Sequence, residues 1–206
     1  MKVRIITQTD VPRLLPMREC VDLMAEALRS MARGEAVQPL RSVSAVPGGV
    51  GGFLASMPAC LGTPRALGVK VITVTPANQG TPFDSHQGAV LLFEAEHGSL
   101  VAVIDATSIT SIRTAAVSAV ATDALARKGA ASAAILGSGV QAAAHLEALR
   151  VVRPIVRVRV WSRSFDHAKA FAAREASRHA IPIEAARTAR EAVEGAEVVC
   201  VATAAR

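Results

Sequence analysis

The stretch Ala130–Glu147, with the sequence AASAAILGSGVQAAAHLE, decides the fold expected for this chain. A short apolar run, Ala133–Leu136, leads into GSGVQA at residues 137–142, and a helix-forming run, Ala142–Leu149, follows at once. An apolar strand, a glycine turn of the form G-x-G-x-x-A and a helix are together typical of a dinucleotide-binding site. The alternative is a glycine-rich turn in an α/β domain that binds no ligand.

Each small residue of this turn has a physical role in the expected site. Gly137 lets the chain turn tightly off the strand, and Gly139, which has no Cβ, lets the backbone approach a pyrophosphate closely. Ala142 is small enough for the helix to pack on the strand. The helix N-terminus offers N–H groups and the positive end of its dipole to the phosphates. We therefore expect a pyrophosphate to bind at this turn.

The rest of the second half continues the alternation of strand and helix. Apolar runs that favour strands alternate with two helices, one capped by Ser164 and one that begins at Thr188. This order is typical of a doubly wound parallel sheet, although a complete dinucleotide domain has about six strands. We therefore expect a partial, four-stranded Rossmann domain in a truncated chain that is poorly soluble or needs a partner. The expected strands are Ala133–Leu136, Ile155–Trp161, Pro182–Ala185 and Val198–Ala202.

The end of the second of these strands indicates which dinucleotide is bound. A site for NAD(H) normally has an acidic residue there, which accepts a hydrogen bond from the ribose 2′-hydroxyl. In this chain Trp161 is followed by Ser162, Arg163 and Ser164, and no acid occurs before Asp166. An arginine between two hydroxyls suits a 2′-phosphate, so NADP(H) is favoured and NAD(H) is the alternative cofactor. The other interpretation of the arginine is a solvated residue at the start of a helix.

The first half predicts an α+β domain with a mixed sheet over residues 1–129. Alternating strands joined by tight turns suggest an antiparallel or mixed sheet. One helix is expected over Met17–Arg33, and another from Thr107 or Ser108 to Lys128. The expected strands are Val3–Ile6, Pro39–Val46, Phe53–Met57, Ala66–Val74, Ala89–Phe93 and Leu100–Ile104.

Four side chains in this half are candidate site residues. Lys70 lies in a strand that reads as apolar on both faces, and a buried ammonium is costly unless it is paired. Lys70 therefore lies either at a solvent-exposed edge of the sheet or in a cavity that supplies an anion. We favour the cavity, in which a substrate carboxylate would be the anion. Arg113 lies beside the apolar stripe of its helix, and its planar fork suits a carboxylate. Arg41 could be a site residue or, with equal weight, a solvated charge on a strand. For His86, a hydrogen-bonded loop residue is favoured over a general acid or base.

The composition argues against several other classes of protein. With 206 residues, 51% of them hydrophobic and 19% charged, the chain is globular. The net charge of +6 comes from scattered arginines and only 3% of residues are aromatic, so no nucleic-acid partner is expected. No apolar run approaches the roughly 20 residues that span a bilayer, and no signal peptide is expected. Cys20, Cys60 and Cys200 match no metal-ligand spacing and are expected to be buried thiols in a reducing cytoplasm.

Taken together, these segments resemble the ornithine cyclodeaminase/mu-crystallin family. The resemblance implies a cytosolic, usually dimeric protein. It also implies a substrate-binding and dimerisation domain at residues 1–129 and an NAD(P)-binding Rossmann domain at residues 130–206. The similarity rests on segments that occur in one order: Arg41, GVKV at 68–71, HQGAVLLFEAEHG at 86–98, IDATSITSIRTAAVSAVATDALA at 104–126 and ILGSGVQA at 135–142.

The resemblance also implies roles for individual residues. Residues that match Arg41, Lys70 and Arg113 bind the substrate carboxylate in the family, which agrees with the independent interpretation of Lys70. The catalytic aspartate of the family, where present, lies beyond the fourth Rossmann strand and so outside this chain, which leaves the catalytic residue unknown and catalysis by this chain alone an open question. The residues expected at the cofactor are Ser85, Thr114, Gly137, Ser138, Gly139, Val140, Gln141, Ser162, Arg163 and Thr203.

The activity that the resemblance implies is hydride transfer at the α-carbon of a small amino or imino acid. One branch of the family converts ornithine to proline with loss of ammonia, and another reduces an imine of a 2-oxo acid. The absence of an acid near Arg163 favours the second branch with NADPH. A non-catalytic protein of the mu-crystallin type that binds NADPH and a small ligand is the alternative, and an inactive fragment is a third.

Overall fold

The protein, seen in a computed structural model, forms two compact units. Helix α2 (Met17–Ala32) and helix α3 (Ala106–Leu125) each contribute residues to both units. The domain boundary that the sequence suggests, at residue 129, follows the end of α3. The structure describes residues 2–47, 51–78 and 81–203; the first unit comprises Met1–Pro16 and Ala25–Thr110, and the second Met17–Met24 and Ser111–Arg206.

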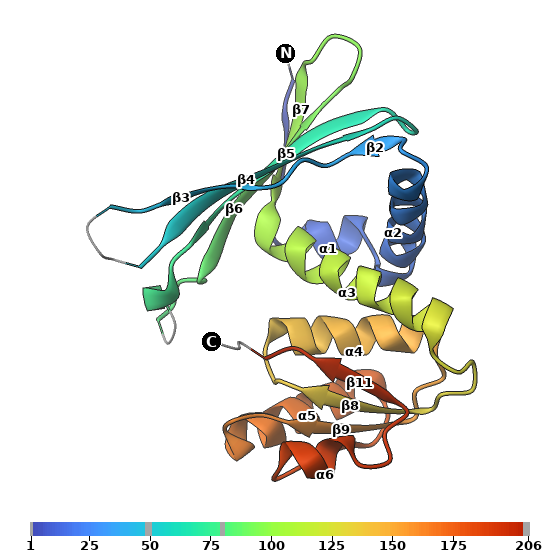
Figure 1. Ribbon diagram of the computed structural model, residues 1–206. Coiled ribbons are helices and arrows are strands. Elements are labelled where there is room, and N and C mark those ends of the chain that lie inside the picture. Colours follow the sequence, from blue (N-terminus) through green and yellow to red (C-terminus); the bar gives the residue numbers. More distant parts are fainter. Residues whose placement is uncertain (1, 48–50, 79–80, 204–206) are drawn as a thin grey trace. The chain divides into compact units, whose positions relative to one another are not determined.

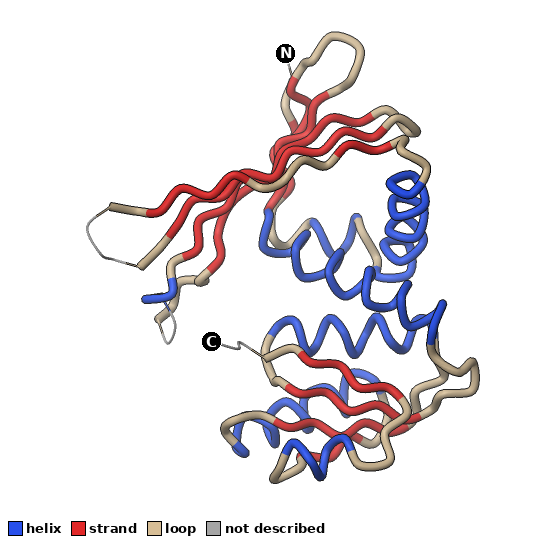
Figure 2. The backbone as a smooth tube through the Cα atoms, viewed as in Figure 1, coloured by secondary structure: helices blue, strands red, loops and turns tan. Residues whose placement is uncertain are grey.

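The first unit contains a mixed sheet, in which seven strands lie among the residues described (Figures 1 and 2). They follow the order β1-β7-β6-β5-β4-β2, and β3 also pairs with β4. Strand β1 runs parallel to β7 and the other pairs are antiparallel, which confirms the mixed sheet expected from the sequence. The strands are β1 (Arg4–Ile6), β2 (Ala36–Val37), β3 (Ser42–Ala45), β4 (Phe53–Leu61), β5 (Ala66–Val74), β6 (His86–Phe93) and β7 (Leu100–Asp105).

Two strands of this sheet are longer than the sequence predicts. Strand β4 continues beyond Met57 through Pro58. Pro58 lies between the part of β4 that pairs with β3 and the part that pairs with β2, where a missing N–H disrupts the ladder least. Strand β6 begins at His86, which pairs with Val74, so the prediction of a loop at His86 is wrong.

Helix α3 has a different start and end from those predicted. The Oδ1 atom of Asp105, the last residue of β7, accepts a hydrogen bond from the Ser108 amide at 2.7 Å. Asp105 therefore caps the helix in place of Thr107 or Ser108, because a carboxylate satisfies the first N–H groups as well as a hydroxyl does. The helix ends at Leu125, before the predicted end at Lys128. The sequence did not predict two short helices, α1 (Val11–Leu14) and η1 (Pro76–Asn78).

The second unit contains a parallel sheet, of which four strands lie in the described part of the chain, in the order β10-β9-β8-β11. Strands and helices alternate, so the partial doubly wound fold is confirmed. The N-cap predicted at Ser164 is present, because its side-chain oxygen accepts the His167 N–H, and Thr188, where a helix was expected to begin, caps α6 by accepting the Glu191 N–H. The elements are β8 (Ser132–Leu136), α4 (Val140–Val152), β9 (Arg157–Trp161), α5 (Phe165–His179), β10 (Ile183–Ala185), α6 (Ala189–Val193) and β11 (Val198–Val201).

Helices cover both faces of this parallel sheet (Figure 1). Apolar side chains of α4 and α5 pack into one cluster with alternate residues of β8 and β9, among them Ile135 and Val160. Arg157 and Arg159 alternate with the buried valines of β9, so both lie on the opposite face, beside α6, and the prediction that they share one face is confirmed.

Arg153, directly after α4, closes the C-terminal end of α3. Only 5% of Arg153 is exposed, and its guanidinium donates to the Asp123 carboxylate at 2.6 Å. The last carbonyl groups of a helix have no partner within the helix, and Arg153 supplies partners here. The carbonyl groups that it contacts belong to Thr122, Asp123, Ala126 and Arg127.

We expect the substitution Arg153→Met to lower the free energy of unfolding by about 3 kcal/mol, because several buried carbonyl groups lose their donor at once. Chemical denaturation followed by circular dichroism measures this change. The control Arg157→Met removes the same charge from an exposed strand position and should cost less than about 0.5 kcal/mol. Equal losses in the two variants would contradict the role assigned to Arg153.

The three cysteines are all free thiols, but they differ in burial. Cys20 is buried and Cys200 is half-buried, and burial raises the pKa of the Cys200 thiol to about 11. Cys60, which pairs with Val37 of β2 and Leu67 of β5, is exposed, so the prediction that all three are buried is wrong. No group of His, Cys, Asp or Glu in the described part of the chain could hold a metal ion. Over the same residues, no helix combines the length and apolar character needed to cross a bilayer.

Candidate functional site

The glycine turn joins β8 to α4 at the carboxyl edge of the parallel sheet. The amide of Gly137 donates to the carbonyl oxygen of Trp161, on the neighbouring strand, at 2.7 Å. Gly137 has a φ of 128°, and a Cβ there would lie 2.4 Å from the carbonyl oxygen of Ala202. A residue with a side chain therefore cannot replace Gly137 without moving the backbone. The tight turn that the sequence predicts at this position is present.

The N-terminus of α4 is open. Gly139 is the N-cap residue, and no side chain caps the first turn. A Cβ built on Gly139 meets no atom of the described chain within 4 Å, and Val140 is 70% exposed. The first N–H groups of α4 and the positive end of its dipole are thus accessible to an anion.

Four buried polar atoms in the second unit have no hydrogen-bond partner among the residues described. Two of them, Glu175 Oε2 and His179 Nε2, lie 3.5 Å from each other on α5. The other two are Oγ1 of Thr114, on α3, and Oε1 of Gln141, in the first turn of α4. An unpartnered buried polar atom costs about 1–3 kcal/mol, so such atoms mark places where a ligand or water completes the bonding. Thr114 and Gln141 both belong to the cofactor contacts predicted from the sequence, and their unpartnered atoms suit the polar groups of a dinucleotide.

Three more of the predicted cofactor residues lie around the same turn. Ser138 Oγ donates to Ser162 Oγ at 3.0 Å, which joins the ends of β8 and β9. The backbone nitrogen of Thr203 lies 3.4 Å from the Cβ position built on Gly137, which places the end of β11 there as well. Ligands of open parallel sheets bind at this carboxyl edge.

Arg163 is exposed at the start of α5, and it makes no ion pair within the part of the chain that the structure describes. The next acid, Asp166, is held by Lys169 Nζ at 2.8 Å, and this bond lowers the pKa of the Asp166 carboxyl. Ser162 accepts a hydrogen bond from Ser138 and Ser164 accepts one from the His167 amide, so the O–H groups of both serines can still donate. The group around Arg163 therefore has donors for a phosphate.

Lys70 lies in the centre of β5, and its Nζ donates to Thr110 Oγ1 of α3 at 3.2 Å. Most of β5 is half-buried, so the prediction of a strand buried on both faces is wrong. The apolar residues of β5 lie in a sheet whose faces are only partly covered by other described residues.

Arg41 lies directly before β3, outside the strands of the sheet. Strand β3 begins one residue after Arg41, so the expected strand Pro39–Val46 is shorter than predicted. If the pairing of β3 with β4 continues by one residue, Arg41 stands opposite Met57, which pairs with Lys70. Residues directly opposite each other on neighbouring strands point to the same face.

The remaining predicted residues of this half are placed differently. Arg113 follows Thr110 by one turn of α3 and is half-buried. Ser85 Oγ lies 3.0 Å from His86 Nδ1. His86 shares the Lys70 face, but it pairs four residues further along β5, about 13 Å away at the rise of a strand. The sheet therefore does not bring the Ser85–His86 pair to Lys70.

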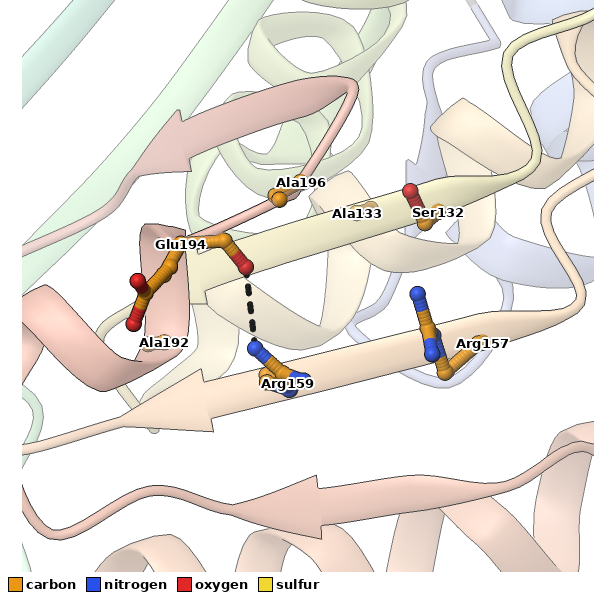
Figure 3. A pocket seen from close by; sticks show the side chains of 8 residues that line it. Ser132, Ala133, Arg157, Arg159, Ala192, Glu194 and Ala196 are labelled. Carbon is orange, nitrogen blue, oxygen red and sulfur yellow. Dashed lines mark hydrogen bonds between the residues drawn. The ribbon is translucent and has the colours of Figure 1, made fainter.

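A hollow at the opposite, amino edge of the parallel sheet contains two arginines (Figure 3). Arg159 donates to the carbonyl oxygens of Glu191 and Glu194 and so closes the end of α6. Arg157 stands beside Ser132. The hollow has an accessible volume of about 10 Å³, which is room for about one water molecule. It is therefore too small to be a ligand site.

A buried polar pair between α3 and α4 was missed by the sequence analysis. His145, which is 8% exposed, has its Nε2 3.0 Å from Ser118 Oγ. The signal available in the sequence was a histidine within the otherwise apolar run AAAHL at residues 142–146. Its partner lies on another helix, and neither periodicity nor motif spacing identifies that partner.

The chain matches the ornithine cyclodeaminase/mu-crystallin family over residues 1–206, and it belongs to this family. It is 39% identical over 170 residues to ketimine reductase mu-crystallin of Mus musculus, covering 82% of this chain and 53% of that protein. Delta(1)-pyrroline-2-carboxylate reductase of Thermococcus litoralis, solved with NADH and L-proline, has a TM-score of 0.93 and 35% identity. An archaeal alanine dehydrogenase, solved as a dimer with bound NAD, has a TM-score of 0.90 and 32% identity.

The match to the two solved structures covers 98% of this chain in each case. It covers 62% of the Thermococcus litoralis chain and 61% of the archaeal dehydrogenase chain. The chain therefore spans about half the length of the mouse relative and about three fifths of these solved chains. The family resemblance found in the sequence is confirmed.

Proposed function

We propose that this protein transfers hydride between a nicotinamide dinucleotide and the α-carbon of a small imino acid, as a ketimine or pyrroline-2-carboxylate reductase. The observation that carries the proposal is the pair of buried atoms without partners, Thr114 Oγ1 and Gln141 Oε1, in the unit that carries the open glycine turn. The relatives named ketimine reductase and pyrroline-2-carboxylate reductase support the choice of reaction.

The second unit would hold the dinucleotide. Gly137 and Gly139 let the backbone approach the pyrophosphate, and the first N–H groups of α4 would bind its oxygens. Thr114 and Gln141 would bind polar groups of the cofactor through the atoms that lack partners. A reduced nicotinamide, when bound, supplies the hydride.

Three cations would bind the carboxylate of the substrate. If the pairing of β3 with β4 continues by one residue, Arg41 lies on the same face of the mixed sheet as Lys70, which bonds to Thr110. The family to which the chain belongs supports a carboxylate-binding role for Arg113 as well. Cations on the carboxylate orient the substrate and stabilise charge that develops during reduction.

The test is turnover measured by nicotinamide absorbance with purified protein. The substrates are a five-membered and a six-membered cyclic imine carboxylate, and ornithine is tested separately for release of ammonia, because cyclodeamination leaves the cofactor unchanged overall. Reduction of either imine supports the proposal. Release of ammonia from ornithine would assign the cyclodeaminase reaction, and saturable NADPH binding without turnover of any of the three would assign a non-catalytic binder.

We also propose that NADP(H) is preferred over NAD(H). Arg163 is exposed beside two hydroxyls, and the nearest acid is held in an ion pair with Lys169. An arginine forms strong, paired hydrogen bonds with a phosphate, and an NADP(H) site needs such a residue near the ribose. A Kd for NAD(H) at least about tenfold lower than for NADP(H) would contradict this preference.

Arg163→Ala is expected to raise the Kd for NADPH about 20-fold and the Kd for NADH less than about twofold, because only NADPH carries the 2′-phosphate. Fluorescence titration of each reduced nucleotide measures both constants. Arg157→Ala, at the amino edge of the same sheet, is the charge-matched control and should change neither constant. Equal weakening of the two nucleotides by Arg163→Ala would place Arg163 away from the 2′-phosphate.

We further propose that the protein acts as a homodimer in the cytoplasm. An archaeal relative solved as a dimer supports the assembly, and the incomplete cover of β5 leaves apolar surface for a second copy. Three free cysteines suit a reducing compartment. Light scattering of the purified protein during size-exclusion chromatography measures the assembly directly.

A further inference from the structure

Within the second unit, a buried series of hydrogen bonds joins α3 to α4. The Nδ1 atom of His145 lies 2.7 Å from the carbonyl oxygen of Gln141, and its Nε2 lies 3.0 Å from Ser118 Oγ. Ser118 Oγ lies 3.3 Å from the carbonyl oxygen of Thr114. This series, which we name the His145 link, connects Thr114 to Gln141.

The end groups of the His145 link determine which ring nitrogen carries a proton. A carbonyl oxygen only accepts, so Nδ1 of His145 donates to Gln141. In the neutral ring Nε2 must then accept, and the hydroxyl of Ser118 donates to it. The hydroxyl of Ser118 has a single proton, so while it donates to Nε2 it does not donate to the carbonyl oxygen of Thr114. The bond between Ser118 and His145 then joins α3 to α4 by itself.

The His145 link ends at two of the residues whose buried polar atoms lack partners. Thr114 and Gln141 each have a backbone carbonyl at one end of the link and keep a buried side-chain oxygen without a partner. The first turn of α4 follows a glycine turn, and its largest apolar side chain, Val140, is 70% exposed, so only the small Ala142 and Ala143 pack it against the core. A buried histidine is costly unless its hydrogen bonds are made, and both of its nitrogens have partners here.

We propose that His145 is a positioning residue for dinucleotide binding. Through Ser118 it sets the first turn of α4 against α3, so that Thr114 Oγ1 and Gln141 Oε1 are held ready for the cofactor. Groups held in place before binding lose less freedom when the ligand arrives, which raises affinity. This inference rests on the proposed nicotinamide-binding function.

Two substitutions break the His145 link at the same bond from opposite sides. His145→Asn keeps an N–H group near the position of Nδ1 but cannot reach Ser118, and Ser118→Ala removes the hydroxyl. Each is expected to raise the Kd for NADPH about tenfold. The double variant should be no weaker than either single variant, because both remove one interaction. Ser118→Thr keeps a hydroxyl and should bind within about twofold of the unaltered protein.

Two further measurements separate positioning from general stability. Phe171→Leu, in the apolar cluster under α5, lowers stability without touching the His145 link, and it should leave the Kd unchanged. Nitrogen-15 NMR of the neutral ring should show a proton on Nδ1 and none on Nε2. A proton on Nε2, or an equal rise in Kd for Phe171→Leu and Ser118→Ala, would overturn the inference.

The outcomes also distinguish this inference from the proposed function. If the unaltered protein bound neither NADPH nor NADH, both would fail. If it bound NADPH, and His145→Asn and Ser118→Ala bound it equally well, the proposed function would stand and only the role of the His145 link would be wrong.

Discussion

Replacement of Lys70 by methionine is expected to lower kcat/KM for an imine carboxylate about 1,000-fold, which is about 4 kcal/mol of transition-state stabilisation. Methionine keeps an unbranched side chain at the centre of β5 but has no charge, so the carboxylate loses a cation that binds and orients it. The Kd for NADPH should change less than about twofold, because Lys70 lies on the mixed sheet and not at the glycine turn. Steady-state kinetics and fluorescence titration measure the two effects.

Arg65→Met is the matched control for Lys70→Met. It removes one positive charge from an exposed position just before β5, and kcat/KM should stay within about twofold. Lys70→Arg should recover part of the lost activity, because it restores the charge with different geometry. Full activity of Lys70→Met would remove Lys70 from the substrate site.

Replacement of Gly137 by alanine is expected to lower the free energy of unfolding by about 4 kcal/mol and to abolish dinucleotide binding. The new Cβ would lie 2.4 Å from the Ala202 carbonyl oxygen, and the backbone has a φ of 128°, which favours glycine. The ends of β8 and β11 would have to separate, and this displaces the turn. Chemical denaturation and NADPH titration measure both losses.

Gly139→Ala separates folding from binding at the same turn. A Cβ at Gly139 meets no described atom within 4 Å, so stability should change by less than about 1 kcal/mol. Binding of NADPH should still weaken about tenfold or more, because the Cβ occupies the space through which the pyrophosphate approaches the backbone. Unchanged binding in Gly139→Ala would contradict the assignment of the glycine turn as the pyrophosphate site.

Much of the candidate cofactor site could be predicted from the sequence. The glycine turn, the N-cap at Ser164 and the absence of an acid before Asp166 are local features, so adjacent residues reveal them. The substrate cations were harder to predict, because Lys70 is identified by one charge in an apolar strand. Only the strand register, if it continues by one residue, indicates that Arg41 shares its face.

Other features depend on residues that are far apart in the chain. Arg153 closes α3 through carbonyl groups about 30 positions earlier, and His145 meets Ser118 across 27 positions. Hydropathy patterns carry no information about such partners, because the bond depends on where two elements pack. For the same reason the loop predicted at His86 is wrong, since its pairing with β5 draws His86 into β6.

The sequence by itself determined the order of the longer strands and helices, the glycine turn, the mixed and parallel sheets and the family. These follow from periodicity, small residues and capping residues, each of which acts within a few positions of the chain. The tertiary structure alone decided which buried polar atoms have partners: those of Arg153 and His145 do, and Thr114 Oγ1 and Gln141 Oε1 do not within the part of the chain described. Hydrogen bonds depend on distance and direction between groups, and packing sets both only after the elements have formed.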